Sequence, residues 1–110
     1  MSEANLLIFV RDLMFSTRIV EAAKDAGVAY KVIRKPDVLM TESGRTLFVD
    51  LDQHGAIDAA GAWRTRTGGE TIGFVSHVNT EAIAQARSAG IDQILSRGQF
   101  TQQLQTLIRS

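Results

Sequence analysis

Seven polar side chains in this sequence follow short apolar runs, and their types could support chemistry on a cation or an anion. They are Arg11, Asp12, Asp50, Asp52, Ser76, His77 and Arg97. Carboxylate oxygens bind hard cations such as Mg²⁺, whereas a guanidinium binds the oxygens of an anion, often in a bidentate fork. Either kind of site requires these side chains to lie close together in space. The helices and strands that carry them must therefore bring them to one place.

Short apolar runs alternate with longer amphipathic segments along the chain. Residues 6–10, 47–49 and 72–75 are nearly continuous apolar runs, which are typical of strands covered on both faces in a parallel sheet. Residues 30–34 are more mixed and predict an edge strand, and residues 93–96 are the candidate for a fifth strand.

The segments between the runs predict five helices. The first covers residues 14–26 and is ended by Gly27, and the second is a short, poor helix from Pro36 to near Gly44. The third covers residues 56–66 and is ended by Gly68 and Gly69, and the fourth is capped by Asn79 or Thr80 and ended by Gly90. The last helix has Phe100, Leu104, Leu107 and Ile108 on one face. Because each strand is followed by a helix and crossovers are right-handed, the pattern predicts an α/β, doubly wound parallel sheet with helices on both faces.

The residues that follow the strands should gather at one edge of this sheet. In open α/β sheets, ligands bind beyond the carboxyl ends of the strands. Polar loops occur at such ends in any protein, and an Asp or Ser there can simply cap the next helix. The joint pattern favours a functional role for Asp12, Asp50, Ser76 and Arg97.

Length and composition limit the classes of function. The 110 residues predict one domain, residues 1–110, and the twelve basic and twelve acidic side chains cancel. This balance favours neither nucleic acid nor a membrane surface as partner. The chain contains no cysteine, and its N-terminus does not have the basic region of a signal peptide. We therefore expect a cytoplasmic protein.

With this order of residues, the sequence resembles the receiver domains of two-component response regulators over nearly its whole length. Asp50 falls at the position of the phosphoacceptor that ends strand three, Ser76 at the hydroxyl position that ends strand four, and Asp12 at the second acid after strand one. The resemblance implies a flavodoxin-like, CheY-like sheet of five strands in the order 2-1-3-4-5. It also implies that Asp12 and Asp50 are the candidate ligands for Mg²⁺ and that Asp50 is the candidate phosphoacceptor.

Several positions depart from the pattern of that family. Arg11 replaces the first acid, Arg97 replaces the strand-five Lys, Gly98 replaces the following Pro, and Ile94 replaces the strand-five aromatic residue. We expect the side chain of Arg11 to reach Asp50 or Asp52 and to oppose Mg²⁺, because arginine is always charged and binds carboxylates in a bidentate fork. No cofactor, or only weakly bound Mg²⁺, is therefore expected.

These departures predict a pseudo-receiver, which is a signalling module that is not an enzyme and that acts by binding a kinase or an output protein. The alternative is a competent Mg²⁺-dependent phosphoacceptor of a phosphorelay, phosphorylated on Asp50.

The partner face of receiver domains commonly consists of helix four, strand five and helix five. Here that face would carry polar, little-charged side chains, namely Gln85, Arg87, Gln93, Gln102, Gln103 and Gln105. Such a surface predicts a monomer or a weak homodimer.

Other kinds of site are less consistent with the sequence. His54 and His77 flanking Asp50 and Asp52 would suit Zn²⁺ or Mn²⁺, but two histidines on surface loops are the favoured interpretation. No P-loop, hydrolase elbow or basic recognition helix is present. Trp63 is expected to pack half-buried beneath the helix predicted over residues 56–66.

Overall fold

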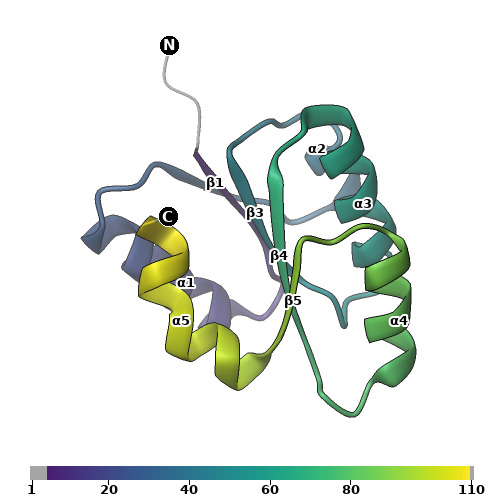
Figure 1. Cartoon of the computed structure of the whole chain (residues 1–110). Coiled ribbons are helices and arrows are strands. Elements are labelled where there is room, and N and C mark those ends of the chain that lie inside the picture. The colour runs from purple at the N-terminus through teal and green to yellow at the C-terminus, as the bar shows by residue number, and fades with distance from the viewer. Residues whose placement is uncertain (1–4, 110) are drawn as a thin grey trace.

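The computed structural model describes residues 5–109, which form one parallel sheet of five strands (Figure 1). The strands are β1 (Leu6–Phe9), β2 (Tyr30–Val32), β3 (Thr46–Asp50), β4 (Glu70–Val75) and β5 (Gln93–Ser96). All neighbouring strands pair in parallel, in the order β2-β1-β3-β4-β5. The predicted fold class and strand order are confirmed.

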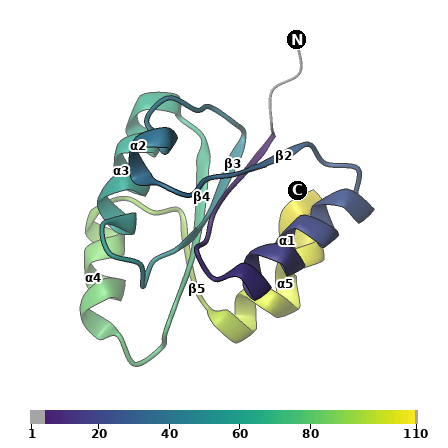
Figure 2. The ribbon, with the colours of Figure 1, turned by 180° about the vertical axis from the view of Figure 1, so that it is seen from behind.

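Five helices cover the two faces of the sheet. They are α1 (Leu13–Asp25), α2 (Pro36–Leu39), α3 (Ala56–Thr67), α4 (Thr80–Ser88) and α5 (Arg97–Arg109). The pair α1 and α5 lies on one face, and α2, α3 and α4 lie on the other (Figures 1 and 2). The sheet is therefore covered on both sides, as its apolar strands require.

Alternation along the strands divides the interior into two cores. Neighbouring residues of a strand point to opposite faces, so Leu7 and Val49 pack towards α3 and α4, whereas Ile8 and Phe48 pack towards α1 and α5. All four side chains are fully buried. This double burial explains why the strands read as continuous apolar runs in the sequence.

Two helix ends formed as expected. The side chain of Asn79 accepts a hydrogen bond from the backbone N–H of Ala82 and caps α4. The left-handed backbone of Gly27, with φ of +70°, ends α1.

The predicted extent of α2 is wrong, because the helix ends at Leu39 and does not continue to near Gly44. The carbonyl oxygen of Glu42 instead accepts hydrogen bonds from Trp63 Nε1, at 3.1 Å, and from Arg66. These contacts tie the chain after α2 to α3 in a non-helical course.

Trp63 is fully buried, so the expectation of half-burial is wrong. Its ring fits because position 69 lacks a side chain. A Cβ atom there would lie 2.2 Å from Cη2 of Trp63, which is closer than real Cβ atoms approach other atoms. Gly69 therefore makes room for the indole, while Gly68, with φ of +73°, ends the helix.

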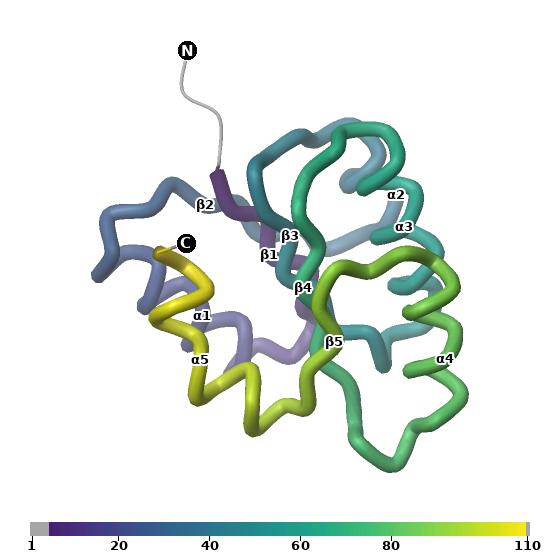
Figure 3. The backbone as a smooth tube through the Cα atoms, viewed as in Figure 1, coloured from purple at the N-terminus to yellow at the C-terminus, as the bar shows by residue number. Residues whose placement is uncertain are grey.

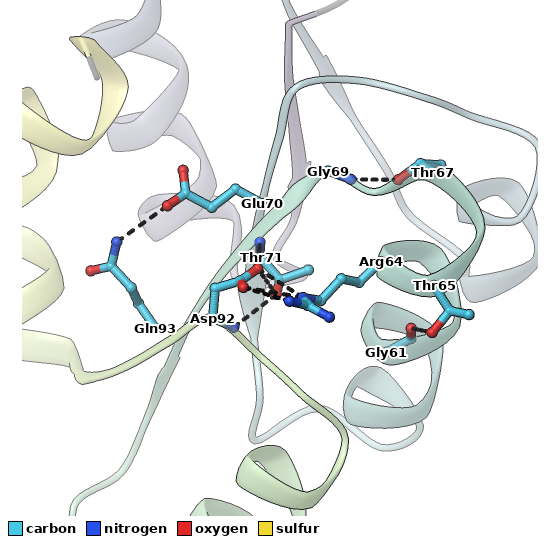
Figure 4. A network of polar contacts seen from close by, with 9 residues as sticks. All are labelled: Gly61, Arg64, Thr65, Thr67, Gly69, Glu70, Thr71, Asp92 and Gln93. Carbon is cyan, nitrogen blue, oxygen red and sulfur yellow. Dashed lines mark hydrogen bonds and ion pairs between the residues drawn. The ribbon is translucent and has the colours of Figure 1, made fainter.

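The amino-terminal ends of β4 and β5 are joined by a polar network around Asp92 (Figure 4). Oδ2 of Asp92 accepts hydrogen bonds from the backbone N–H of Thr71 at 2.8 Å and from its hydroxyl at 2.9 Å. The same hydroxyl accepts from the N–H of Asp92 at 3.0 Å, and Arg64 donates to both carboxylate oxygens. This network fixes β5 against β4 and α3 at the end of the sheet away from the predicted site.

The connections that follow β1, β3, β4 and β5 lie together at the opposite end of the sheet (Figure 3). Of the seven polar residues singled out in the sequence, Asp50 is the last residue of β3, Arg97 is the first residue of α5, and the other five lie in these connections. Within residues 5–109, no helix has the length and apolar character needed to cross a membrane.

Candidate functional site

Asp50 ends the central strand β3, and its carboxylate is nearly buried, with 6% of the residue exposed. Oδ2 accepts a hydrogen bond from Nη2 of Arg97 at 3.3 Å, and Oδ1 accepts one from the backbone N–H of Asp52 at 3.0 Å. Burial raises the pKa of Asp50, and this effect outweighs the backbone hydrogen bond and the Arg97 charge, which lower it. The site is thus a desolvated carboxylate with a protein cation as its counter-charge.

The guanidinium of Arg97 is held by aromatic rings as well as by Asp50. It lies 5.2 Å from the ring centroid of Phe15 on α1 and 5.1 Å from that of Phe74 on β4. Both distances are within the range of cation–π attraction. Three contacts from three elements therefore orient one side chain towards the end of β3.

A capping box places Arg97 in the first turn of α5. The backbone N–H of Ser96 donates to Oε1 of Gln99 at 2.9 Å, and the N–H of Gln99 donates to Oγ of Ser96 at 3.1 Å. This reciprocal pair satisfies two donors at the start of the helix. The chain turns from β5 directly into α5, and Arg97 follows the cap.

Arg11 does not make the expected contact with Asp50 or Asp52, and that prediction is wrong. Its side chain is exposed and forms no ion pair within residues 5–109. Its backbone N–H donates to Oε1 of Gln53 at 2.9 Å, while Nε2 of Gln53 donates to the carbonyl oxygens of Phe9 and Asp50. The amide of Gln53 thus bridges the ends of β1 and β3, and Arg97 supplies the cation beside Asp50.

Asp12 caps α1, because its Oδ1 accepts a hydrogen bond from the backbone N–H of Phe15 at 3.1 Å. It also lies close enough to Asp50 for its charge to contribute to the raised pKa of that carboxyl group. The two carboxylates therefore lie at the same edge of the sheet, as predicted, but each already has a partner.

Asp52 joins two neighbouring loops. Its Oδ2 accepts from the backbone N–H of Ser76 at 2.9 Å, and its Oδ1 accepts from Nδ2 of Asn79 at 2.9 Å. This brings Ser76 to the edge that carries Asp50. His77 is exposed and makes no hydrogen bond or ion pair with any residue that the structure describes.

A groove of about 360 Å³ lies between the loop after β3 and the start of α4. Asp52, His54 and Glu81 are among the residues that line it. Across residues 5–109, no three His, Asp or Glu side chains form a group that could hold a metal ion. The histidine-containing metal site considered for the sequence therefore does not form in the described part of the chain.

The carboxylates near Asp50 that could bind Mg²⁺ already have partners within the chain. This ion is bound in proteins by one or two carboxylates together with water and phosphate oxygens. Here Asp50 is paired with Arg97, and Asp12 is engaged at the start of α1. A divalent cation at Asp50 would lie close to the positive charge of Arg97, and one at Asp12 would share that carboxylate with the helix cap.

Comparison with known proteins was informative only for three-dimensional structure. No protein-family model matches the sequence, and no curated protein is similar to it. A CheY-like response regulator receiver domain from Methanospirillum hungatei JF-1 superposes with a TM-score of 0.78 at 11% identity, covering 98% of this chain and 95% of that one. The receiver domain of NtrX from Brucella abortus superposes with a TM-score of 0.78 at 12% identity, covering 94% of both chains.

The chain has the receiver fold. A third structure, the phosphorylated cyanobacterial phytochrome response regulator RcpA, superposes with a TM-score of 0.75 at 10% identity and covers 98% of this chain and 90% of that one. Identities this low establish the receiver fold alone, so the properties of the site depend on its own residues.

Two contributors to this receiver-fold site were missed in the sequence. The first is the capping box of Ser96 and Gln99, which the S-x-x-Q spacing could have revealed. The second is Gln53, which no sequence pattern distinguishes from any other loop glutamine. Asn79, predicted only as a cap, also holds Asp52.

Proposed function

We propose that this chain is a receiver-type signalling module of the two-component class that acts by binding a protein partner and has a degenerate phosphoacceptor pocket. The receiver fold, matched over nearly the whole chain, supports the class. The module is not an enzyme, and its partner is a kinase or an output protein. We place it in the cytoplasm, where two-component output modules receive their signals.

The observation that carries the proposal is the pairing of Asp50 with Arg97. A phosphoacceptor carboxylate needs a free oxygen for in-line attack and a hard cation to neutralise the incoming phosphoryl charge. At this site the guanidinium of Arg97 contacts one oxygen and the backbone of Asp52 contacts the other. Neither contact requires a metal ion, so the pocket is complete without one.

The partner-binding face proposed for the module consists of α4, β5 and α5. Of the six side chains predicted for this face, Gln93 is partly buried and five are exposed: Gln85, Arg87, Gln102, Gln103 and Gln105. All of them except Arg87 are uncharged amides. A surface of this kind supports hydrogen-bonded contact of moderate affinity more than electrostatic steering. We therefore propose a monomer or a weak homodimer in solution.

A competent phosphoacceptor is the second candidate function. It is favoured by the position of Asp50 at the end of the central strand, with Asp12 nearby and Ser76 at the end of β4. In that case Mg²⁺ would displace Arg97 from Asp50 during the reaction.

Labelling by acetyl phosphate separates the two functions. Wild type, Asp50→Asn and Ser76→Ala are incubated with acetyl phosphate and Mg²⁺ and are examined by intact mass. We expect wild type to show no more of the phosphorylated mass than Asp50→Asn does. Efficient labelling of wild type that disappears in Asp50→Asn and without Mg²⁺ would overturn the degenerate pocket and establish the second function.

A further inference from the structure

Arg97 connects Asp50 to a cluster of four phenylalanine rings between the sheet and the helices α1 and α5. Phe15 lies 4.7 Å from Phe74 and 5.8 Å from Phe100, measured between ring centroids. Phe100 also lies 4.9 Å from Phe74 and 5.1 Å from Phe48. The cluster thus joins α1, β3, β4 and α5 in one layer of aromatic contacts.

The guanidinium bridges this cluster to the buried carboxylate. It contacts Asp50 on one side, and the rings of Phe15 and Phe74 lie within 5.2 Å of its central carbon. Because Arg97 is in the first turn of α5 and Phe15 is in the first turn of α1, the guanidinium also connects these two helices. Its position therefore depends on the charge of Asp50 and in turn affects the start of both helices.

The link from Asp50 to the start of α4 consists of hydrogen bonds and contains no ion pair. It runs through Asp52, whose carboxylate accepts from the backbone of Ser76 and from Nδ2 of Asn79. The bond between Asp52 and Asp50 uses a backbone N–H donor and Oδ1 as acceptor. A neutral carboxamide oxygen can accept the same bond, so this link does not require the Asp50 charge.

We propose that the Asp50–Arg97 pair is a latch between α1 and α5, so that any event that takes Asp50 away from Arg97 loosens the first turns of these two helices and leaves α4 unchanged. Such an event is the arrival of a competing cation, a partner side chain or a covalent modification at Asp50. The inference rests on the proposed function because it assigns a conformational response to the same site. It places that response on the α1–α5 side of the sheet.

The pair is accessible enough for such competition. The side chain of Arg97 is 43% exposed, whereas that of Asp50 is 8% exposed. A cation–π contact and a partly exposed ion pair each contribute modestly to stability. The latch can therefore open locally while the rest of the fold stays intact.

Hydrogen–deuterium exchange tests the latch in the metal-free protein. Wild type is compared with Asp50→Asn and Arg97→Gln, which remove the ion pair from its two sides without a large change in volume. Arg64→Gln is the matched control, because it breaks another arginine–aspartate pair at the opposite end of the sheet (Figure 4). Urea unfolding of each variant gives its global stability, to which local exchange is compared.

We expect exchange in peptides covering the first turns of α1 and α5 to be about five- to tenfold faster in Asp50→Asn and Arg97→Gln than in wild type. Exchange in α4 should stay within about twofold of wild type, and Arg64→Gln should leave α1 and α5 unchanged. Phe15→Leu, which keeps the ion pair but removes one ring from the guanidinium, should loosen the same two turns.

Two results would overturn the latch. One is unchanged exchange at the starts of α1 and α5 in Asp50→Asn. The other is faster exchange that is as large in α4 as in α1 and α5. Neither result bears on phosphorylation, and labelling of Asp50 by acetyl phosphate would refute the degenerate pocket without refuting the latch.

Discussion

Nη2 of Arg97 lies 3.3 Å from Oδ2 of Asp50, and the same guanidinium lies over the rings of Phe15 and Phe74. The carboxylate at the centre of the sheet edge therefore has a cation that is part of the chain and is held in place from three directions. Burial of a carboxylate is costly unless it is paired.

Arg97→Ala should destabilise the fold by about 1–2 kcal/mol, because it leaves Asp50 buried without its counter-charge. The value is lower than for a fully buried pair, since Arg97 is partly exposed to water. Urea unfolding at neutral pH measures the difference. Arg18→Ala is the control, because Arg18 is exposed on α1 and makes no ion pair with other described residues. Equal stability of the two variants would contradict the role of Arg97.

Asp50→Asn should be more stable than wild type at neutral pH. The pKa of Asp50 is raised by burial, so the folded protein holds this proton more tightly than the unfolded chain does. Wild type therefore loses stability as the pH rises from the unfolded pKa, about 3.9, through the higher folded pKa. The difference in the free energy of unfolding between Asp50→Asn and wild type should be largest at pH values above the folded pKa. It should vanish at pH values below the unfolded pKa. Thermal unfolding of both proteins across the acidic range measures it, and a variant less stable than wild type at neutral pH would contradict the argument.

Thr71→Val should cost about 1–3 kcal/mol, because it removes a buried hydroxyl that accepts from the backbone N–H of Asp92 and donates to its carboxylate. Desolvation alone raises the pKa of Asp92, but hydrogen bonds from Arg64 and Thr71 outweigh it, and the pKa lies below its usual value. The stability that this carboxylate contributes is present above its unfolded pKa and is lost as the pH falls through the folded pKa. Urea unfolding at neutral and at strongly acidic pH should therefore show a smaller cost of Thr71→Val in acid.

Ser96→Ala should lower the free energy of unfolding by about 1 kcal/mol, as is typical for loss of a helix cap. For a domain of this size, the melting temperature should fall by about 5 °C. Because the cap also orients Arg97, the variant should show faster exchange at the start of α5. Ser96→Thr, which can keep the capping hydroxyl, should recover most of the loss. Equal melting temperatures of Ser96→Ala and wild type would show that the box does not hold the helix.

The strands and most helix boundaries could be predicted from local signals, whereas the strand order followed from the resemblance to receiver domains and the extent of α2 was missed. The apolar runs that became β1, β3 and β4 are buried on both faces, and caps such as Asn79 and Gly27 marked helix ends. The full burial of Trp63 was missed because it depends on two tertiary contacts: the hydrogen bond from Nε1 to the carbonyl oxygen of Glu42 and the close approach of the ring to Gly69.

Which arginine pairs with Asp50 could not be predicted from the sequence. Both Arg11 and Arg97 were placed at the correct edge, but the sequence favoured Arg11 as the partner of Asp50. Which guanidinium reaches the carboxylate depends on side-chain direction, and here Gln53 occupies the bridge between β1 and β3 while the cap of α5 directs Arg97 inward. The S-x-x-Q spacing indicates the cap of α5, but no spacing along the chain predicts the bridge made by Gln53 or the contact of Arg97 with Asp50.

The most direct test of the account is calorimetric titration with Mg²⁺ of wild type, Arg97→Ala, Arg18→Ala and the double variant Arg11→Asp/Arg97→Ala. A guanidinium about 4 Å from a cation opposes its entry by about 4 kcal/mol per unit charge at an effective dielectric near 20. We predict no saturable binding to wild type or Arg18→Ala, measurable binding to Arg97→Ala, and tighter binding to the double variant, which has an additional carboxylate. Saturable binding of Mg²⁺ to wild type that Asp50→Asn abolishes would contradict the claim that Arg97 closes this pocket.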